Sequence, residues 1–499
     1  MAVGLLLLMH MVMPTFAVDH YVSLAGTNNP PYTNWADAAT NIQWAVDAAT
    51  NEDVVLVSNG TYYLSNQISI TAAITMASVN GRELTIINGN YPNVTNRCLY
   101  MSNSPFVGGF TITNGYAATN DISGCGGGLY VSSGTISNCL ITGNTSTKYG
   151  GGIFFSGGGT ASTCTVKGNV AAQRGGGIYS VVDSAVYFLM SCCSIIANSV
   201  TNSNNGGGGL YCRGRILDSI IASNILISSG ATYGGGVLFI AGYMSNCVIS
   251  WNVATNAAQC GGVALGGGSL ADAPTIYNSL ISNNTSYGHA GGVFMYSGCS
   301  NSGVNCVIAN NTAGNGAGGI WMDSSGKIRQ CLIRNNSAKA YGGGVVVYDI
   351  KNNNGSVDSC TIVGNTATNT GGGIVTRNTN NNYSVSNCVV WGNTTNGSYV
   401  SDIGDYSNST NSFFAFSYTC ANYTNFPAGR GNITNDPQFV DSTFGNYRLN
   451  ANSPCVNAGS NQNWMTNAVD FDGRQRVRYG TVDMGAYETI YQGSIYRIP

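Results

Sequence analysis

Charged side chains are scarce in this sequence. Only 8% of the 499 residues are Asp, Glu, Lys or Arg, and 19 basic against 21 acidic residues give a net charge of −2. A nucleic-acid-binding protein needs a basic patch, and a charged tail would appear as a run of like charges. The sequence has neither, so we expect no nucleic-acid partner. The three histidines, His10, His20 and His289, are too scattered to predict a metal site.

Long hydrophobic runs are also missing. The apolar stretch over residues 3–8 and 11–13 is too short to span a bilayer. Thr15-Phe16-Ala17 follows it and resembles a signal-peptide cleavage site, although no Lys or Arg precedes the stretch. We therefore predict a signal peptide over residues 1–17, no transmembrane segment, and a protein that is secreted or carried on a bacterial outer cell surface.

Glycine, in contrast, is abundant, with 68 residues, and much of it forms a repeat. Ten blocks of small residues, most of them Gly-Gly-Gly, are each followed by an aliphatic residue. The blocks start at Gly126, Gly150, Gly175, Gly207, Gly234, Cys260, Ala290, Ala317, Gly342 and Gly371. Their spacing runs from 24 residues (126 to 150) to 32 residues (175 to 207). A period of this length predicts a solenoid, in which each repeat forms one coil.

A second pattern recurs in step with the glycine blocks. It is an asparagine, preceded three residues earlier by Ile or Val and five residues earlier by Cys or Ser. The asparagines are Asn144, Asn169, Asn198, Asn224, Asn252, Asn284, Asn311, Asn336, Asn365 and Asn393. Side chains alternate across a strand, so the Cys/Ser and aliphatic positions face the same side. The pattern therefore predicts a short strand with one buried face.

The repeat predicts an all-β fold. It is too short for a βαβ crossover and carries no helical stripe. Short strands separated by Gly and Asn turns indicate a single-stranded parallel β-helix whose coils rise by about 4.8 Å. In this fold the asparagines would form an inward ladder, each amide bonding to the next coil. The glycines would allow positive φ and close backbone approach at one corner.

Sixteen cysteines in an exported chain would ordinarily indicate a disulfide framework. Eight of them, however, occupy the inward repeat position: Cys139, Cys164, Cys193, Cys247, Cys306, Cys331, Cys360 and Cys388. Ser219 and Ser279 replace Cys there in two coils, so the position needs a small side chain rather than a thiol. We predict that this column is an unpaired stack, while the other cysteines leave a few bridges open.

The N-terminal part differs from the repeats. Residues 34–49 have the pattern of an amphipathic helix with Asn34 as N-cap, and residues 53–57 have that of a strand. A helix in this place would cover the open edge of the first coil. We expect a capping helix and first coils over residues 18–114, regular coils over 115–400, and last coils with an irregular C-terminal cap over 401–499.

These features resemble three groups of known proteins. The helix-then-strand start resembles the N-terminal cap of secreted, right-handed, pectin-lyase-like β-helix proteins. The Gly-Gly-x-aliphatic and Ile-x-x-Asn pairs resemble the repeats of chlamydial polymorphic outer membrane proteins, although those usually carry Phe where this chain has Ile or Val. The tail resembles the bacterial choice-of-anchor C-terminal domain in residues 436–441, 447–449, 453–459, 470–474 and 482–488. The resemblance implies a right-handed helix. Because no sorting anchor is visible after Glu488, it also implies a freely secreted or truncated chain.

Function in a β-helix depends on its outward columns. Three residues past the glycine-block aliphatic, successive coils carry Tyr296, Asp323, Tyr348 and Arg377. Resemblance to pectate lyases implies a reaction in which acidic residues hold Ca²⁺ against a uronate and an Arg or Lys removes a proton. Asp323 and Arg377, expected about 10 Å apart, are the catalytic candidates. Scattered surface polar residues are the alternative interpretation.

Aromatic residues form a second outward column, one residue past the same aliphatic. It contains Tyr130, Phe154, Tyr179, Tyr211, Leu238, Ala264, Phe294 and Trp321. Aromatic rings on a poorly charged face suit the apolar faces of sugar rings. Phe294 and Trp321, together with Tyr296 and Tyr348, are therefore the predicted carbohydrate-binding residues. Cross-strand stacking, or cover by a loop, is the alternative interpretation.

Asp470-Phe-Asp472-Gly473 begins like a calcium loop but lacks the later ligands of an EF-hand. Asp470 and Asp472 are the candidate Ca²⁺ ligands, with a turn in the C-terminal cap as the alternative, and no other cofactor is expected. Because charges are so few, the sequence favours a non-catalytic, carbohydrate-binding, adhesin-like surface protein. A polysaccharide lyase or hydrolase acting on an acidic glycan, and a structural surface spacer, are the alternatives.

Overall fold

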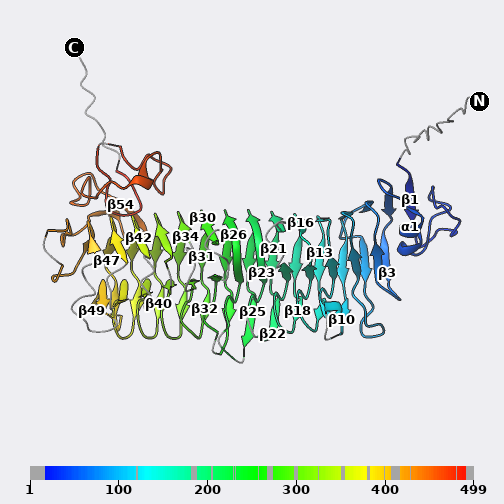
Figure 1. Cartoon of the computed structure of the whole chain (residues 1–499), viewed down its shortest axis with the longest axis horizontal. Coiled ribbons are helices and arrows are strands. Elements are labelled where there is room, and N and C mark those ends of the chain that lie inside the picture. Colours follow the sequence, from blue (N-terminus) through cyan, green and yellow to red (C-terminus); the bar gives the residue numbers. More distant parts are fainter. Residues whose placement is uncertain are drawn as a thin grey trace, which may run out of the picture.

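The protein forms one long solenoid with a cap at each end (Figure 1). The computed structural model describes residues 17–119, 122–180, 188–203, 206–228, 230, 232–256, 258–266, 273–296, 302–323, 325–349, 355–378, 383–397, 399–405, 416–426, 429–478 and 480–489. Within these ranges, no helix has the length and apolar character needed to cross a membrane.

In two coils the first two strands are fused, as β23 (Leu210–Leu217) and β26 (Val237–Ser245), and each other regular coil contributes four short strands to three faces. In one coil these are β33 (Val293–Met295), β34 (Ser302–Val304), β35 (Val307–Ala309) and β36 (Thr312–Ala313). They pair in parallel with the next coil's β37 (Ile320–Met322), β38 (Lys327–Arg329), β39 (Leu332–Arg334) and β40 (Ser337–Ala338). The first two strands of each coil belong to sheet A, the third to sheet B and the fourth to sheet C. The predicted parallel β-helix is therefore confirmed.

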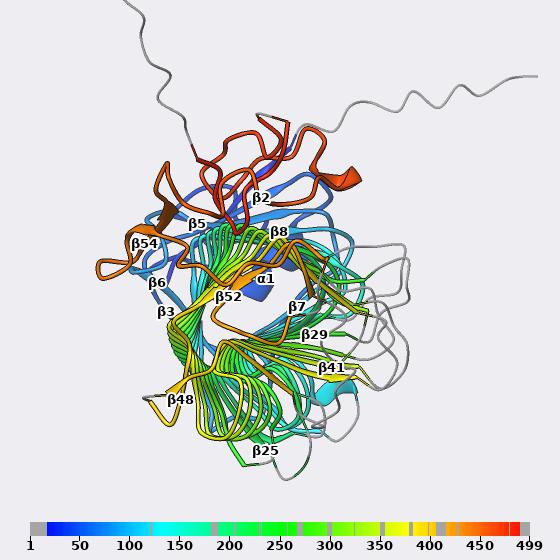
Figure 2. The same cartoon turned by 90° about the vertical axis from the view of Figure 1, so that its left-hand side faces the viewer.

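The handedness of the solenoid is visible along its axis, from the C-terminal end (Figure 2). Within a coil the chain starts on the right with the first strand of sheet A, such as β29 (Val263–Leu265) or β41 (Val345–Asp349), and the second strand of sheet A follows at the top. The chain then runs down sheet B on the left and returns through sheet C below. It turns counterclockwise while advancing toward the viewer, which makes the helix right-handed, as predicted. Sheet C closes a smaller lobe below β29 and β41.

The main core is filled by the predicted aliphatic and Cys columns. Ile281 and Ile308 are no more than 2% exposed, and the Cys column is equally buried. Each thiol of this column donates to a nearby backbone carbonyl, as Cys306 Sγ does to Val304 O at 3.3 Å. Burial raises the pKa of Cys247 to about 12, so this thiol stays neutral. All cysteines in the described ranges are free, which confirms the unpaired stack.

The repeat asparagines form the predicted inward ladder, and all ten are fully buried. Asn252 illustrates the bonding, because its backbone N–H and its Nδ2 both donate to Asn284 Oδ1, at 3.0 and 2.9 Å. At the C-terminal end Asp402 takes the place of the next asparagine and accepts both Asn393 donors at 2.9 Å. Burial raises the pKa of Asp402 to about 6. The ladder therefore ends on a group that satisfies its last donors.

The glycine blocks form the corner where the chain leaves sheet C for sheet A. The first glycine of a block has positive φ in several coils, for example 62° at Gly150. The third glycine is required because there is no room for a side chain. A Cβ on Gly292 would lie 2.7 Å from Gly319 O and 3.0 Å from Asn311 Nδ2. Successive coils therefore stack too closely at this corner for a side chain.

The N-terminal end is closed by helix α1 (Ile42–Ala48), which lies across the end of the solenoid (Figure 2). The helix predicted over residues 34–49 exists but begins later. Asn41, and not Asn34, is the N-cap, since its side chain accepts the Gln43 backbone N–H at 2.8 Å. Asn34 instead accepts the Asp37 N–H at 2.9 Å in a preceding turn. Residues 1–16 of the predicted signal peptide lie outside the described ranges.

The C-terminal cap packs on the outer faces of sheets A and B over the last coils, with Trp464 against Arg329 of sheet A and Met484 against Val389 of sheet B. It contains an antiparallel pair, β53 (Phe439–Asp441) and β54 (Asn446–Leu449), and a 3-10 turn, η4 (Asn463–Met465). The rest of the described cap is irregular. Met484 of the cap is buried in one cluster with Val389 of sheet B. The cap therefore covers the sheet B surface at the last coils, and the edge of the cap adjoins the part of sheet B that stays uncovered.

Candidate functional site

The aromatic column predicted to face outward is mostly covered. Five of its members point away from the main core but are only 5–9% exposed: Phe154, Tyr179, Tyr211, Phe294 and Trp321. The residue just before a glycine block packs back onto this column, as Tyr149 does on Tyr179 with 4.8 Å between ring centroids. The interpretation as an accessible sugar-binding face is therefore wrong for most of the column. Its rings stabilise the stack of coils by cross-strand packing.

The cover is interrupted over the middle coils, where a hollow of about 250 Å³ opens. Ala264 stands in the aromatic column, and Gly316 stands at the position before a glycine block. A Cβ on Gly316 would lie 2.5 Å from the Trp321 ring, so glycine is needed there for this ring, which is 5% exposed, to pack against the backbone. The hollow is lined by Tyr233, Gln259, His289, Phe294, Trp321, Asp323 and Tyr348. We call it the Trp321 hollow.

Aromatic rings form the walls of the Trp321 hollow. The Trp321 ring is parallel to that of Phe294, at 6.4 Å and 4°, and lies 5.0 Å from that of Tyr348. Tyr233 lies 5.3 Å from Phe294 and 4.1 Å from Tyr296. Tyr296 and Tyr348 are half-buried, so part of each ring is accessible. The arrangement offers flat apolar surfaces at different angles around one small space.

Polar groups complete the lining. His289 lies 4.6 Å from the Trp321 ring centroid, and its Nδ1 hydrogen-bonds to Gln259 Oε1. Burial lowers the pKa of His289, so the imidazole is neutral near pH 7. Burial and then the negative charge of Asp323 raise the pKa of Tyr233, which keeps its phenol proton. The lining thus combines one carboxylate with neutral hydrogen-bonding groups, and none of its members is Lys or Arg.

The structure brings most of the predicted site residues together. Phe294, Trp321, Asp323 and Tyr348 line the Trp321 hollow, and Tyr296 packs at its edge. Arg377 lies one coil beyond Tyr348, because the two are register partners between β41 and β45 (Ile374–Asn378). The side chain of Arg377 is outside the described part of the structure.

Three lining residues were not predicted: Tyr233, Gln259 and His289. Each directly precedes a glycine block, as Tyr149 and Tyr341 do in other coils. Aligning this position as a further column would have shown that polar and aromatic side chains recur there. It would also have shown that glycine stands at this position in two coils, at Gly206 and Gly316.

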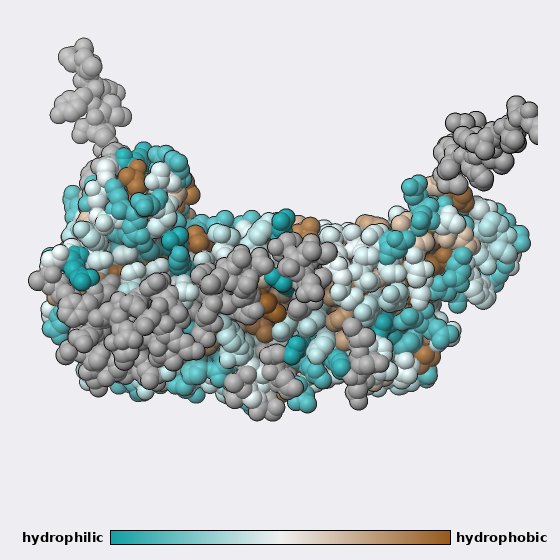
Figure 3. All heavy atoms as spheres, viewed as in Figure 1, coloured by the Kyte–Doolittle hydropathy of each residue, from teal (hydrophilic) through white to brown (hydrophobic). Residues whose placement is uncertain are grey.

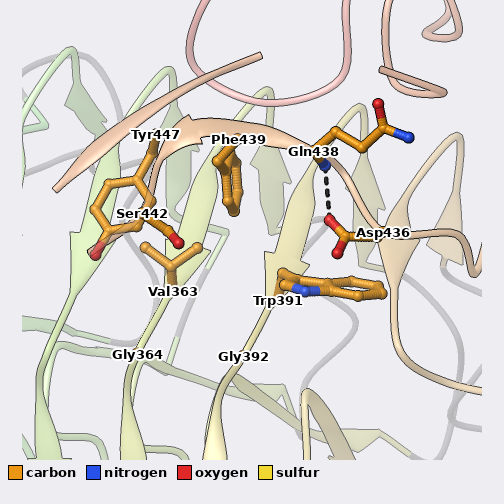
Figure 4. Close-up of a pocket in the computed structure, with 9 residues that line it drawn as sticks. All are labelled: Val363, Gly364, Trp391, Gly392, Asp436, Gln438, Phe439, Ser442 and Tyr447. Carbon is orange, nitrogen blue, oxygen red and sulfur yellow. Dashed lines mark hydrogen bonds between the residues drawn. The ribbon is translucent and has the colours of Figure 1, made fainter. Parts of the chain in front are cut away.

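A second hollow, of about 450 Å³, lies between sheet B and the C-terminal cap (Figure 4). On the solenoid side it is lined by the ends of β43 (Thr361–Val363) and β47 (Val389–Trp391) and by the glycine after each. The cap contributes Asp436, Gln438, Phe439, Ser442 and Tyr447. Figure 4 shows the Trp391 ring below Asp436, whose Oδ1 accepts the Gln438 backbone N–H at 2.7 Å. We call this the Trp391 hollow; none of its residues was predicted to be functional.

The geometry around Asp470 and Asp472 contradicts their interpretation as calcium ligands. Asp470 Oδ1 accepts the backbone N–H groups of Asp472 and Arg474, at 2.9 and 2.7 Å, and its Oδ2 accepts that of Glu488 at 2.7 Å. Both Asp472 oxygens pair with Arg448 or Arg474. All four oxygens are engaged by protein donors, so the segment is a turn of the cap. Among the described residues no cluster of three or more His, Cys, Asp or Glu side chains could hold a metal ion.

Comparison with known proteins gives a local sequence match and distant structural likenesses. Residues 138–156 match the Chlamydia polymorphic membrane protein (Chlamydia_PMP) repeat. No curated protein matches the chain. Pectate lyase Pel9A is similar over 95% of this chain and 98% of its own, with 14% identity and a TM-score of 0.27. A family 6 polysaccharide lyase specific for mannuronic acid, from human gut microbiota, is similar over 81% and 86%, with 11% identity and a TM-score of 0.28. XylC in complex with xylose is similar over 81% and 75%, with 10% identity and a TM-score of 0.23. None of these likenesses bears on activity.

Proposed function

We propose that this chain is a non-catalytic carbohydrate-binding protein with an adhesin-like role outside the cell, and that the Trp321 hollow receives part of a glycan. The observation that carries the proposal is the clustering of aromatic rings and a carboxylate where an otherwise closed column opens. The apolar face of a sugar packs on such rings while its hydroxyls bond to polar groups. A volume of 250 Å³ is slightly below the ~300–1,000 Å³ of ordinary small-molecule sites, which suits a short part of a longer chain.

The charge of the Trp321 hollow favours a neutral glycan. Asp323 is the single carboxylate of the lining, and His289 is neutral because burial lowers its pKa. An acidic sugar would bring a second negative charge close to Asp323, and like charges at short range repel each other. The hydroxyl of a neutral sugar could instead donate a charge-assisted hydrogen bond to Asp323.

The surrounding surface also suits a neutral polar polymer. Figure 3 shows one long face of the molecule, on which white and teal prevail and brown is confined to small areas. Charged residues are only 8% of the chain, so this polarity comes chiefly from hydroxyl, amide and backbone groups. The match of residues 138–156 to a membrane-protein repeat and the apolar N-terminal stretch support a location at or beyond the cell surface.

A lyase acting on an acidic glycan is the second candidate, because one observation favours it. The register of β37, β41 and β45 places Asp323, Tyr348 and Arg377 on three successive coils. A guanidine base there could remove the proton next to a uronate carboxylate. Calcium-dependent formation of unsaturated product from polygalacturonate or alginate, followed by ultraviolet absorbance, would establish this activity. Glycan binding without such product supports the non-catalytic proposal.

Replacing Tyr348 with alanine is expected to weaken glycan binding about tenfold, because a stacking contact contributes about 0.5–1.5 kcal/mol and each 1.4 kcal/mol is a factor of ten. Asp323→Asn should weaken it less, since an acceptor oxygen remains. Binding is measured first on a glycan array and then by calorimetry with the best neutral oligosaccharide. Tyr130→Ala is the control, because it removes a half-buried outward ring, from the column that contains Trp321, far from the hollow. Equal affinities for Tyr348→Ala, Asp323→Asn and the control would disprove the proposed site.

A further inference from the structure

We propose that the Trp391 hollow is a second carbohydrate-binding site, so that one molecule can bridge two glycan chains. This inference rests on the proposed function in one respect, namely that both hollows bind sugars. The Trp391 hollow shares no residue with the Trp321 hollow. Trp391 is half-buried at the end of β47, and its ring forms one wall of a space of about 450 Å³. This volume lies within the ~300–1,000 Å³ of ordinary ligand sites.

The floor of the Trp391 hollow is kept bare by two glycines. Gly364 and Gly392 occupy the corner after sheet B, with φ of 64° and 67°. Other coils carry asparagine at this corner, also with positive φ: Asn283, Asn310 and Asn335. A Cβ on Gly392 would meet no atom within 4 Å, so packing does not require glycine there. The absence of a side chain instead leaves open space beside the Trp391 ring.

Polar groups stand on the opposite side, on the cap. Asp436 and Gln438 are exposed, and the Gln438 backbone N–H fixes the Asp436 carboxylate by a 2.7 Å hydrogen bond to Oδ1. In Figure 4 this carboxylate lies above the Trp391 ring, and the Ser442 hydroxyl lies farther along the hollow. A sugar that stacks on Trp391 would therefore present hydroxyls to Asp436 and Ser442. Asp436 is the single charged residue in the lining, so we again infer a neutral sugar.

The two hollows face different directions. Viewed along the solenoid axis, β54 of the cap lies at the left beside sheet B, whereas β29 and β41 extend to the right (Figure 2). The Trp321 hollow belongs to the coils between β29 and β41, and the Trp391 hollow lies under the cap. Two sites on different sides of a rigid rod can bind two polymer chains at once, which raises avidity without any new contact.

The test fills the Trp391 hollow without removing any packing. Gly392→Asn places on its floor the residue that other coils carry at the same corner, so folding should be preserved. Gly168→Asn is the matched control, because Gly168 has φ of 64° at the same corner of a distant coil and a Cβ there would make only an ordinary 3.9 Å contact. Trp391→Ala is the second variant. The probes are neutral xylan, glucomannan and β-glucan oligosaccharides in calorimetry, and the same polysaccharides in a turbidity assay of cross-linking.

We expect two sugar sites per chain in the wild type and in Gly168→Asn, and one in Gly392→Asn or Trp391→Ala. In Tyr348→Ala we expect one site of unchanged affinity and one about tenfold weaker, which is not populated at the concentrations that fill the first. Each single-site variant should bind polysaccharide but lose cross-linking. This inference is overturned if the wild type has one sugar site and that site is lost in Tyr348→Ala but kept in Gly392→Asn. The proposed function would then remain intact. One wild-type site that is lost in Gly392→Asn but kept in Tyr348→Ala would support sugar binding at the Trp391 hollow and disprove it at the Trp321 hollow. No binding of any probe by the wild type would overturn both proposals.

Discussion

Replacing Asn284 with alanine is expected to lower the free energy of unfolding by about 3–5 kcal/mol, because each buried polar group left without a partner costs about 1–3 kcal/mol. Asn284 Oδ1 accepts two N–H groups of Asn252, and its Nδ2 donates to Ile249 O at 3.0 Å and Asn311 Oδ1 at 2.9 Å. The side chain is fully buried, so water cannot replace these four bonds. Urea unfolding and hydrogen exchange of the coils on either side would measure the loss.

The adjacent residue provides a matched control. Asn283 has φ of 56° and is half-buried at the corner where other coils carry glycine, as at Gly143 and Gly168. Asn283→Gly should change stability little, since glycine adopts this conformation without strain. The loss in Asn284→Ala should be concentrated in exchange protection of the coils of Asn252, Asn284 and Asn311. Equal stability of the two variants would show that the ladder does not hold the coils together.

The interior of the solenoid follows closely from the sequence. The Cys, aliphatic and Asn columns could be predicted because alternation along one strand fixes which side chains share a face, and the same register recurs in every coil. Asp402 could not be found in this way. It takes the ladder's next place only nine residues after Asn393, through a chain path that the repeat does not contain.

The outward side was predicted less well, because what covers it comes from other parts of the chain. Alternation indicates that Phe154 and Tyr179 face away from the core, but it does not show that Tyr149 returns to pack against them. The contact of the Trp321 ring with Gly316, where a Cβ would lie 2.5 Å from the ring, does not follow from alternation either. The Trp391 hollow joins residues 391 and 436, which only the docking of the cap brings together.

Replacing Arg476 with leucine is expected to destabilise the C-terminal cap by about 3–5 kcal/mol above pH 8, the usual cost of removing one partner of a buried ion pair. The Arg476 side chain is 0% exposed, and its Nε lies 3.3 Å from Glu488 Oε1. Its Nη1 also donates to Gly485 O at 3.0 Å. The variant therefore leaves the Glu488 carboxylate, itself only 4% exposed, without its cation. Hydrogen exchange and limited proteolysis of residues 436–489 would detect the loosened cap.

The destabilisation caused by Arg476→Leu is expected to increase with pH, because it depends on the charge of Glu488. Burial raises the pKa of Glu488 to about 8, although the positive charge of Arg476 lowers it. Since this folded-state pKa lies above the unfolded value, the folded cap binds the proton more tightly, and stability falls as pH rises from about 4.5 to about 8. Without Arg476 the pKa of Glu488 rises further, so the loss in Arg476→Leu should be largest above pH 8 and should shrink toward pH 5, where Glu488 is neutral in both proteins. Arg478→Leu, at an exposed position two residues away, is the control and should show neither the loss nor the added slope. A loss in Arg476→Leu of equal size at both pH values would mean that packing, and not the charge of Glu488, makes Arg476 necessary.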